Sequence, residues 1–579
     1  LASVGVFVLH PHIPTCYNAP NMQNTKFLFV IGGVMSGVGK GASTASLGRL
    51  LKAKGFSVTA MKIDPYVNVD AGTMNPIEHG EVFVTIDGDE TDQDIGNYER
   101  FLDIDITRDN YMTTGRVYQS VIERERNLEY GGRCVEVVPD VPEEVIRRID
   151  AVAESSKADF VMIEIGGTVG EYQNILFLEA LRMMKQRDPN SVRSILVSYL
   201  PVPPSIGEMK TKPTQHAVRE LNRTGITPDF LICRSEHDVD DVRKEKLARF
   251  CGVPKDHIIG APNCESIYTI PQMFEDQNFG DSVLQSLGLE PRETDLSVWN
   301  GLASKISGIK EEVVIGVIGK YFTTGSYVLS DVYISVLEAI KHGAWANNKK
   351  PVIKWLNSED YENDPGKLED LRELDGILIP GGFGTRGIEG KIMAVKFARE
   401  NKIPYFGICY GMQCAVIEYA RNVLGYADAN TEEMNPKTHH LMIHFMKGQK
   451  ENAENQKYGG TLRLGSWPCK LKDGTATARA YEIGQINERH RHRYEFNNKY
   501  RSELETAGLV VSGESPDGEL VEIVEITDHP FFVGVQFHPE FQSRPLTPHP
   551  LFRAFAEAAV KHRELRPEIS SITNELETA

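Results

Sequence analysis

Near the start of the chain, a short apolar run leads into a glycine-rich segment and then into an amphipathic stretch. Phe27–Ile31 are apolar, residues 32–41 contain five glycines and one lysine, and residues 42–54 follow a helical pattern rich in alanine and leucine. This order predicts a strand, a loop and a helix. A second strand, predicted at Ser57–Ile63, closes a parallel, right-handed βαβ unit and commits this part of the chain to an α/β fold.

The alternation of strand and helix continues through the first half of the chain and begins again in the second half. Further strands are predicted at Asp159–Ile165, Ser194–Tyr199, Asp229–Cys233, His257–Ile259, Val313–Ile318, Val352–Trp355, Gly376–Ile379 and Ile403–Ile408. Helical patterns, such as those at Glu143–Glu154 and Gln215–Asn222, lie between them. The sequence therefore predicts an α/β protein with two doubly wound domains.

A polar stretch at 288–312 is the predicted linker between these domains, which cover residues 22–287 and 313–562. Residues 1–21 precede the first predicted strand and are interpreted as an extension, with a segment docked on the surface as the alternative. The tail at 563–579 is charged and is expected to fray.

The composition is that of an ordinary folded protein and argues against several classes of function. Of 579 residues, 63 are basic and 81 are acidic, and the net charge of −18 argues against a broad surface for nucleic acid. No apolar run approaches the roughly 20 residues of a membrane span. The eight cysteines show no CxxC spacing, so we expect no disulfide framework and a reducing compartment, the cytoplasm.

The glycine-rich segment has most features of a phosphate-binding loop but departs from the usual motif. Glycine N–H groups, a helix N-terminus and the Lys40 ammonium together favour an anion. Five residues separate Gly33 from Gly39, where the usual motif has four, and Gly41 stands where a Ser or Thr would bind Mg²⁺. A glycine-rich turn with a solvated lysine is the alternative. If a nucleotide binds here, its Mg²⁺ needs oxygen ligands from elsewhere.

Two acidic segments offer such ligands. Glu164 follows an apolar run and precedes two glycines, which places it at the carboxyl end of a predicted strand, where ligands gather in sheets of this kind. Asp92 lies in an acidic run at 87–92, and spacing alone does not distinguish it from a solvated loop charge. A basic segment, Lys210–Gln215, leads into a predicted helix and is either a second phosphate site or an exposed turn.

In the second half, Cys409 lies in a G-x-C-x-G pattern between a predicted strand and a predicted helix. This is the cysteine form of a nucleophile elbow, a sharp turn that exposes the thiol at a helix N-terminus, where a thiolate is stabilised. His538 and Glu540 complete the pattern of a Cys-His-Glu triad. The glycines within 381–384 are candidates for an oxyanion hole. The alternative is that Cys409 is a buried structural thiol.

Long strings of residues in both halves resemble the CTP synthase family. The first half contains MKIDPYVNVDAGTMNP at 61–76, HGEVFV at 79–84, YERFL at 98–102, EIGGTVG at 164–170 and GEMKTKPTQH at 207–216. The second half contains PGGFG, GICYGMQ and RHRHRYE, and is similar to class I glutamine amidotransferases. The resemblance extends from Lys26 to Phe555.

This resemblance implies a P-loop-type amidoligase domain followed by a class I glutamine amidotransferase domain. The implied reaction is phosphorylation of UTP at O4 by ATP, followed by displacement of the phosphate by ammonia to give CTP, the last step of de novo CTP synthesis. The ammonia would come from glutamine and pass between the domains through an internal channel. The resemblance also implies Mg²⁺, GTP as an allosteric activator, CTP as a feedback inhibitor, and a homotetramer that can assemble into filaments.

Matching motifs also imply site residues. The implied catalytic residues are Lys40, Lys62, Cys409, His538 and Glu540. Residues implied at the ATP site are Gly37, Val38, Gly39, Lys40, Gly41, Ala42 and Cys264. Those implied at the UTP and CTP site are Ser36, Glu171, Tyr172, Gln173, Lys210, Thr211, Lys212, Pro213, Thr214, Gln215 and Lys246. Those implied to bind glutamine are Gly382, Phe383, Tyr410, Gly411, Met412, Gln413, Glu433 and Arg493. His79 and Val82 are implied at the ammonia channel, and Asp92 and Glu164 at the metal.

Three segments depart from the family pattern. GEYQN at 170–174 replaces the family's GDIES, Val138-Pro139-Asp140 replaces its VPH, and the segment at 319–333 is longer than usual. These departures leave open the strength of CTP feedback and the affinity for nucleotides.

Two other functions remain open. One is an ATP-dependent amidotransferase with a different acceptor, against which the KTKPTQ and MKIDPY strings argue. The other is a structural or regulatory filament protein, against which the intact catalytic positions argue. The glutaminase half excludes a partition-type ATPase.

Overall fold

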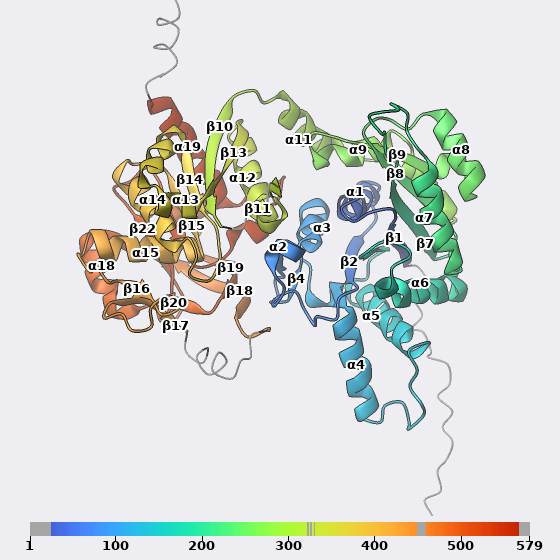
Figure 1. The fold of residues 1–579 in the computed structure, drawn as a ribbon, viewed down its shortest axis with the longest axis horizontal. Helices are drawn as coiled ribbons and strands as arrows, with labels where there is room; N and C mark the ends of the chain where they lie inside the picture. The colour runs from blue at the N-terminus through green and yellow to red at the C-terminus, as the bar shows by residue number, and fades with distance from the viewer. Residues whose placement is uncertain are drawn as a thin grey trace, which may run out of the picture.

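The computed structural model describes residues 25–320, 330–446, 449 and 459–566, and the backbone of residues 323, 324, 327 and 328. The predicted extension at 1–21, the side chains of residues 321–330 within the long 319–333 segment, and the tail beyond residue 566 lie outside this description. Figure 1 shows two lobes, each containing one large sheet.

The first lobe contains a sheet of seven parallel strands. Their spatial order is β5 (Tyr111–Thr113), β2 (Val58–Asp64), β6 (Phe160–Ile165), β1 (Lys26–Gly32), β7 (Val192–Tyr199), β8 (Phe230–Ser235) and β9 (Ile258–Pro262). The helices of this half are α1 (Lys40–Ala53), α2 (Pro76–His79), α3 (Asp94–Leu102), α4 (Thr114–Arg126), α5 (Asp140–Ser156), α6 (Ile175–Arg187), α7 (Lys212–Arg223), α8 (Asp241–Cys251), α9 (Ile270–Glu275), α10 (Phe279–Ser286) and α11 (Ser297–Gly308). The predicted strands and the doubly wound class are confirmed.

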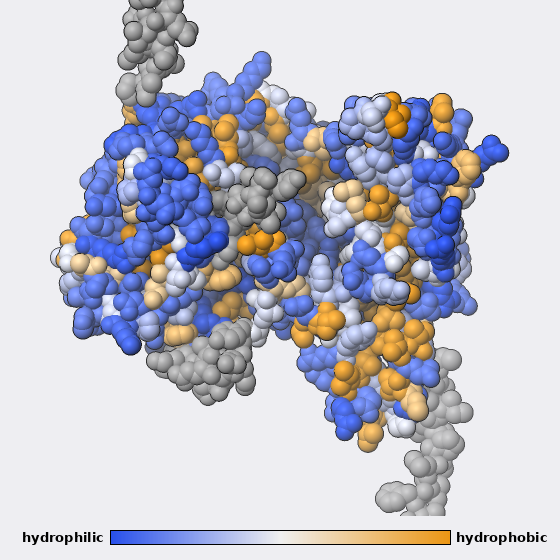
Figure 2. Space-filling model, viewed as in Figure 1, coloured by the Kyte–Doolittle hydropathy of each residue, from blue (hydrophilic) through white to orange (hydrophobic). Residues whose placement is uncertain are grey.

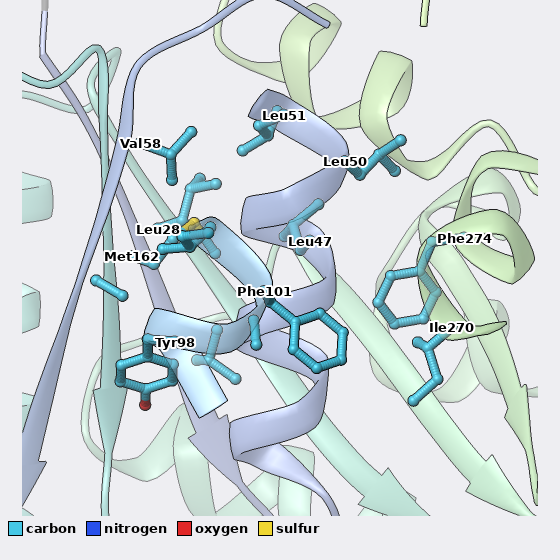
Figure 3. Packing of buried hydrophobic residues seen from close by; sticks show 14 of the residues in the cluster. Leu28, Leu47, Leu50, Leu51, Val58, Tyr98, Phe101, Met162, Ile270 and Phe274 are labelled. Atoms are coloured by element: carbon cyan, nitrogen blue, oxygen red, sulfur yellow. The ribbon is translucent and has the colours of Figure 1, made fainter. Parts of the chain in front are cut away.

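Strand β1 shows why the strands of this sheet appear in the sequence as continuous apolar runs. Leu28 and Val30 belong to one hydrophobic cluster, whereas Phe27, Phe29 and Ile31 belong to another. Successive side chains point to opposite faces, so both faces of the sheet are covered and every position from Phe27 to Ile31 is apolar. Figure 3 shows one of these clusters, where leucines of α1 pack between the sheet and the side chains of α3 and α9.

The second lobe contains a sheet of nine strands, parallel on one side and antiparallel on the other. Their order is β13 (Lys350–Asn357), β10 (Glu312–Gly319), β14 (Gly376–Ile379), β15 (Tyr405–Ile408), β23 (Phe532–Val535), β22 (Val521–Ile526), β21 (Leu509–Glu514), β18 (Arg463–Leu471) and β19 (Gln485–His492). The helices are α12 (Ile334–Ala346), α13 (Ser358–Asn363), α14 (Ile388–Glu400), α15 (Tyr410–Asn422), α17 (Ala476–Tyr481), α18 (Arg501–Ala507) and α19 (Pro550–Leu565). Two clusters cover the two faces of this sheet as well.

Smaller elements complete the fold. The small sheets contain β3 (Val82–Val84) with β4 (Glu90–Asp92), β11 (Thr323–Thr324) with β12 (Tyr327–Val328), and β16 (Asn430–Thr431), β17 (Leu441–Phe445) and β20 (Tyr494–Phe496). The 3-10 turns are η1 (Arg108–Asn110), η2 (Tyr172–Asn174), η3 (Lys255–His257), η4 (Ile267–Thr269), η5 (Ser330–Tyr333), η6 (Pro365–Glu373), η7 (Asn498–Tyr500) and η8 (Pro539–Gln542). Among the helices that the structure describes, none is long and apolar enough to cross a membrane.

The stretch predicted as a polar linker contains helix α11, which runs between the two lobes (Figure 1). Trp299 anchors this helix, because its side chain is buried and its Nε1 donates a hydrogen bond to the Tyr268 carbonyl at 2.6 Å. Ile306 and Ile309 also pack against this core but are only partly buried, so the sequence showed no apolar run there. The linker is therefore structured, and the ends of the predicted domains stay a prediction.

Candidate functional site

The glycine-rich loop connects the end of β1 to the start of α1. Gly37 and Gly39 have φ of +71° and +92°, a left-handed conformation that favours glycine. The Lys40 side chain folds back over the loop, and its Nζ donates to the Gly167 carbonyl at 3.0 Å. A Cβ at Gly32 would lie only 2.7 Å from the same Gly167 carbonyl oxygen, so glycine is required there. The loop, the helix N-terminus and Lys40 lie together at the carboxyl edge of the sheet, an arrangement that favours an anion.

The second lysine of this site, Lys62, is surrounded by four carboxylates. Its Nζ lies 2.8 Å from Glu164 Oε1, 3.5 Å from Asp92 Oδ1 and 3.9 Å from Asp64 Oδ1. It also contacts the carboxylate of Asp94. Lys62 and Asp64 share one face of β2, because side chains two positions apart on a strand point the same way.

The charges in this cluster do not balance. Burial raises the pKa of Glu164 and of Asp92 to about 7, and that of Asp64 to about 6, although Lys62 opposes the effect. Burial also acts on Asp94, but the Lys62 ammonium outweighs it and lowers the pKa of Asp94 to about 2. Four carboxyl groups around one ammonium therefore favour a further cation.

Carboxylate oxygens are the ligands that Mg²⁺ prefers, so this cluster fits the predicted metal. Glu164 is where the sequence predicted it, whereas Asp94 was missed. A Cβ at Gly41 would lie 1.9 Å from Asp94 Oδ1, so Asp94 lies against the start of α1. Burial acts to raise the pKa of both Asp94 and Glu164 and the Lys40 charge opposes it, as expected for a pair near the phosphate loop. The order D-x-D in 92–94, with the second Asp opening a helix, is the signal that would have found Asp94.

Asp92 lies on the other side of the cluster. Its Oδ2 is 3.5 Å from His79 Nε2, and the side chains of Asp64, His79 and Asp92 bring possible ligand atoms within 4.8 Å of one another. The predicted role of Asp92 at the metal stays a prediction.

In the second lobe, Cys409 lies at the turn between β15 and α15. Its φ is +49° and its ψ is −97°, a strained conformation for a residue with a side chain. The Cys409 N–H donates to the Val535 carbonyl at 2.6 Å, and Gln536 Nε2 lies 3.5 Å from the sulfur. A Cβ at Gly411 would lie 2.3 Å from the Ile379 carbonyl, so the turn requires glycine. This is the geometry of the predicted elbow.

His538 and Glu540 complete the cluster around this sulfur. His538 Nδ1 lies 2.8 Å from Glu540 Oε1, and both side chains are buried. Burial alone would lower the pKa of His538, but the charge of Glu540 and the interaction with Cys409 raise it to about 10. The imidazole therefore carries its proton at neutral pH, beside the Cys409 sulfur. Gly381 lies against the ring, since a Cβ there would be 2.7 Å from His538 Cε1.

A cavity of about 530 Å³ opens over Cys409. Six of the residues predicted to bind glutamine line this cavity: Gly382, Phe383, Tyr410, Gln413, Glu433 and Arg493. Gly411 and Met412 lie behind the wall, and Met412 is fully buried. Gly72, Pro76, Glu81 and Val82 of the first half also line the cavity. The nucleophile therefore faces a space that both halves of the chain enclose.

Comparisons with known proteins identify the family. Residues 26–289 match the family model for the CTP synthase N-terminus, and residues 328–558 match that for class-I glutamine amidotransferase. The CTP synthase of Clostridium kluyveri is 51% identical over 545 residues, which cover 93% of this chain and 100% of that protein. The chain belongs to the CTP synthase family.

A second curated relative agrees with this assignment. The CTP synthase of Herpetosiphon aurantiacus is 49% identical over 541 residues, which cover 93% of this chain and 99% of that protein. The solved glutaminase domain of Trypanosoma brucei CTPS with bound acivicin is 39% identical, with a TM-score of 0.40, and covers 43% of this chain and 94% of that one. The resemblance seen in the sequence is confirmed, and the chain is an enzyme, a carbon–nitrogen ligase with a glutamine amidotransferase domain.

The nucleotide residues predicted for a CTP synthase lie at the carboxyl edge of the first sheet. At the start of α7, Gln215 Nε2 donates to Thr211 Oγ1 at 3.0 Å. Glu208 accepts hydrogen bonds from Lys210 Nζ at 2.6 Å and from Arg243 of α8 at 3.2 Å. This bridge holds the Lys210 segment beside the helix that carries Lys246. Lys212, Pro213 and Thr214 belong to α7, Ser36 lies exposed in the glycine-rich loop, and Cys264 is half-buried after β9.

The family departures have structural partners. Glu171 Oε1 accepts hydrogen bonds from the Thr168 N–H at 3.1 Å and from its hydroxyl at 2.6 Å. Gln173 Nε2 donates to Glu171 Oε2 at 2.6 Å, whereas Tyr172 is 95% exposed. Asp140 is buried and pairs with Arg133 before α5. Tyr172 is therefore the departure whose ring is available to a ligand or a neighbouring subunit.

Replacing Glu540 with glutamine is expected to change the pH dependence of glutamine hydrolysis. The fall in rate on the alkaline side should begin at a lower pH. The carboxylate is the strongest charge that keeps the His538 pKa raised, and the amide removes it. Glutamate release measured between about pH 6 and 10 reports this limb. Glu488 pairs with His549 in a similar buried contact at 3.0 Å, so Glu488→Gln is the matched control. An unchanged limb in Glu540→Gln would contradict the assignment.

Proposed function

We propose that this enzyme makes CTP from UTP with ATP and with ammonia released from glutamine, through UTP phosphorylated at O4. Phosphorylation is needed because a carbonyl oxygen is a poor leaving group. The observation that supports this step is the placement of Lys40 and Lys62 at the carboxyl edge of one sheet. Two ammonium groups there neutralise and align the transferred phosphoryl group. Asp94, Glu164 and the predicted ligand Asp92 would hold Mg²⁺, which supplies further charge neutralisation when bound.

At the second site, the Cys409 thiolate attacks the amide carbon of glutamine and forms a thioester. His538, which carries its proton at neutral pH, donates it to the departing ammonia and then takes a proton from the attacking water. Glu540 holds the ring, and Gly382 and Phe383 line the cavity, so their N–H groups are the candidates for stabilising the oxyanion.

The passage of ammonia between the sites is also part of the proposal. The cavity over Cys409 is lined by Val82, and His79 lies three residues earlier beside Asp92. Ammonia must stay unprotonated to attack, so an enclosed route favours the reaction. Burial lowers the pKa of His79, which keeps its imidazole neutral and unable to protonate ammonia at neutral pH.

A homotetramer with nucleotide sites between subunits is supported by exposed apolar side chains. Ile122, Leu128 and Val137 are 60%, 71% and 60% exposed around the protruding end of α4 and the loop that follows it. Figure 2 shows apolar residues gathered there, as on a surface that a second copy covers.

GTP activation, CTP feedback and filament assembly complete the proposal. A catalytic thiol must stay reduced, which supports a cytoplasmic location.

The test measures the conversion of UTP to CTP by its change in absorbance. ATP is present in every reaction, and the nitrogen source is glutamine in one and ammonium in another. We expect CTP from both sources with Mg²⁺, and at least a 100-fold loss, on the order of that for removing a catalytic metal, when EDTA removes it. Glutamate release should persist in EDTA, because the Cys409 site uses no metal in this proposal. No CTP from either source in folded protein that binds ATP would overturn the proposal and favour the filament function.

A further inference from the structure

The hairpin of β3 and β4 lies between the two sites. Val82 pairs with Asp92 and Val84 pairs with Glu90. One end of the hairpin carries Asp92, whose Oδ1 is 3.5 Å from Lys62 Nζ. The same hairpin also contacts the second domain through Phe83 and Glu90, along two separate paths.

The first path runs through aromatic rings. Phe83 is fully buried, and its ring meets that of Phe541 edge-on at 5.0 Å. Phe541 in turn stacks on the His538 imidazole at 5.1 Å with 12° between the planes. Phe541 lines the cavity over Cys409, and Phe83 packs behind it. A single side chain thus connects the hairpin to the imidazole of the triad.

The second path runs through β19. Arg491 Nε donates to Glu90 Oε1 at 2.9 Å, and the Glu90 side chain is only 2% exposed. The Arg491 carbonyl lies 3.9 Å from Cys409 Sγ. Two residues earlier, Arg489 Nη1 donates to the Val84 carbonyl at 3.1 Å, and the Arg489 carbonyl accepts the His538 N–H at 2.7 Å. Cys409 and His538 therefore both contact β19, and side chains of β19 in turn contact the hairpin.

A third contact fixes the base of the hairpin. The Glu81 carboxylate accepts the Ser335 N–H at 3.2 Å, at the start of α12. The Glu81 N–H donates to the Asp331 carbonyl at 2.9 Å. A carboxylate at a helix N-terminus satisfies N–H groups that the helix cannot. The first domain thus caps a helix of the second domain and anchors the hairpin against it.

We propose that Phe83 and Glu90 are positioning residues of glutamine hydrolysis, contributed by the synthase domain and acting through Phe541 on His538 and through Arg491 on Cys409. This proposal rests on the function proposed above. A phosphoryl group that pairs with Lys62 competes with Asp92 for the same ammonium, so nucleotide binding changes a contact that holds one end of the hairpin. A ligand shifts an equilibrium only through such differential contacts.

Phe83→Leu is the first test, because leucine fills part of the space but removes the ring that meets Phe541. In the full-length enzyme with ATP and UTP, we expect kcat for glutamate release to fall on the order of tenfold, since small misplacements of catalytic groups are costly. The KM for glutamine should stay near that of the unchanged enzyme, because Phe83 lies behind the cavity wall. CTP formation from ammonium should change by less than about twofold, since the synthase site is intact.

Phe101→Leu is the matched control. Phe101 is equally buried in the same cluster (Figure 3), but its ring stacks on Tyr268 and packs against Trp299. We expect a similar loss of Tm and glutamate release within about twofold of the unchanged enzyme. Equal loss of glutamate release in both variants would show a general effect of core damage and would overturn the proposal for Phe83.

Glu90→Gln keeps the proposal testable if Phe83→Leu does not fold. It removes the charge that Arg491 pairs with, and we expect glutamate release with nucleotides to fall on the order of tenfold. Asp87→Asn is its control, because Asp87 lies in the turn of the same hairpin but pairs with Arg108 of its own domain. Unchanged glutamate release in Glu90→Gln would overturn the proposal. If the unchanged enzyme makes no CTP from ammonium, the proposed function fails, whereas this proposal is judged on glutamate release alone.

Discussion

Replacing Cys409 with alanine is expected to reduce CTP formation from glutamine by at least about 1,000-fold, in line with the loss of a nucleophile from a triad. CTP formation from ammonium should stay within about twofold, because ammonia then enters without the thioester. The sulfur is the only atom of this side chain that attacks the amide, and the methyl group of alanine leaves the turn at φ +49° in place. The absorbance change from UTP to CTP, with each nitrogen source in turn, measures both effects.

Cys414→Ala is the control for this variant. Cys414 lies on α15, the helix that begins directly after Cys409, and is fully buried, and burial raises the pKa of its thiol to about 12. It is therefore a packing thiol, and we expect both reactions to persist. CTP from glutamine at an undiminished rate in Cys409→Ala would refute the nucleophile. Loss of both reactions, in protein that keeps its Tm, would contradict the independence of the two sites.

The elbow at Cys409 and the phosphate loop were predictable because each is a local pattern. Glycines, a strand and a helix succeed one another within a dozen residues, and the positive φ values at Gly39 and Cys409 are what such patterns require. The same holds for β1, whose continuous apolar run reflects burial on both faces.

Asp94 and helix α11 were missed because their roles depend on distant parts of the chain. Asp94 acquires its role when α3 packs beside α1 and brings it to Lys62, 32 residues away in the sequence. Trp299 anchors α11 through a carbonyl in η4. A local pattern holds no information on such partners, so the acidic run could not be resolved into single ligands.

The hairpin contacts were equally hidden. Phe83 belongs to a string that the family resemblance identifies as a unit, and nothing in its neighbours points to Phe541, which lies hundreds of positions later. The alternation of arginine and histidine in RHRHRYE becomes meaningful only in the strand, where Arg489 and Arg491 share the face that meets Glu99 and Glu90.

Lys62→Met is expected to abolish CTP formation from both nitrogen sources, with a loss of at least about 1,000-fold, as for other charges that neutralise a transferred phosphoryl group. Removing one partner of a buried ionic cluster also costs stability, on the order of 3–5 kcal/mol, because unpaired charges remain. Glu164 and Asp92 limit this cost by taking up protons, since their pKa values are already raised to about 7.

The loss of stability in Lys62→Met should therefore depend on pH. A carboxyl group whose pKa is raised in the folded protein favours folding while it stays protonated, and this contribution is lost as the pH rises through the folded-state pKa. Removing the ammonium raises these pKa values further, so the difference in Tm from the unchanged enzyme should grow between about pH 6 and pH 8. Thermal melts at the two pH values measure it.

Lys54→Met separates the chemical role from the structural one. Lys54 is as buried as Lys62 and pairs with Asp281 at 2.7 Å and Glu275 at 3.3 Å, but it lies at the far end of α1 from the phosphate loop. Its loss should lower Tm and leave CTP formation from ammonium within about threefold below the melting range. If Lys62→Met retained the rate of Lys54→Met, Lys62 would be a structural counter-ion for its four carboxylates. A rate lost in Lys62→Met alone, with glutamate release still measurable, places the phosphoryl transfer at Lys62, whose ammonium lies among four carboxylates at the carboxyl end of β2.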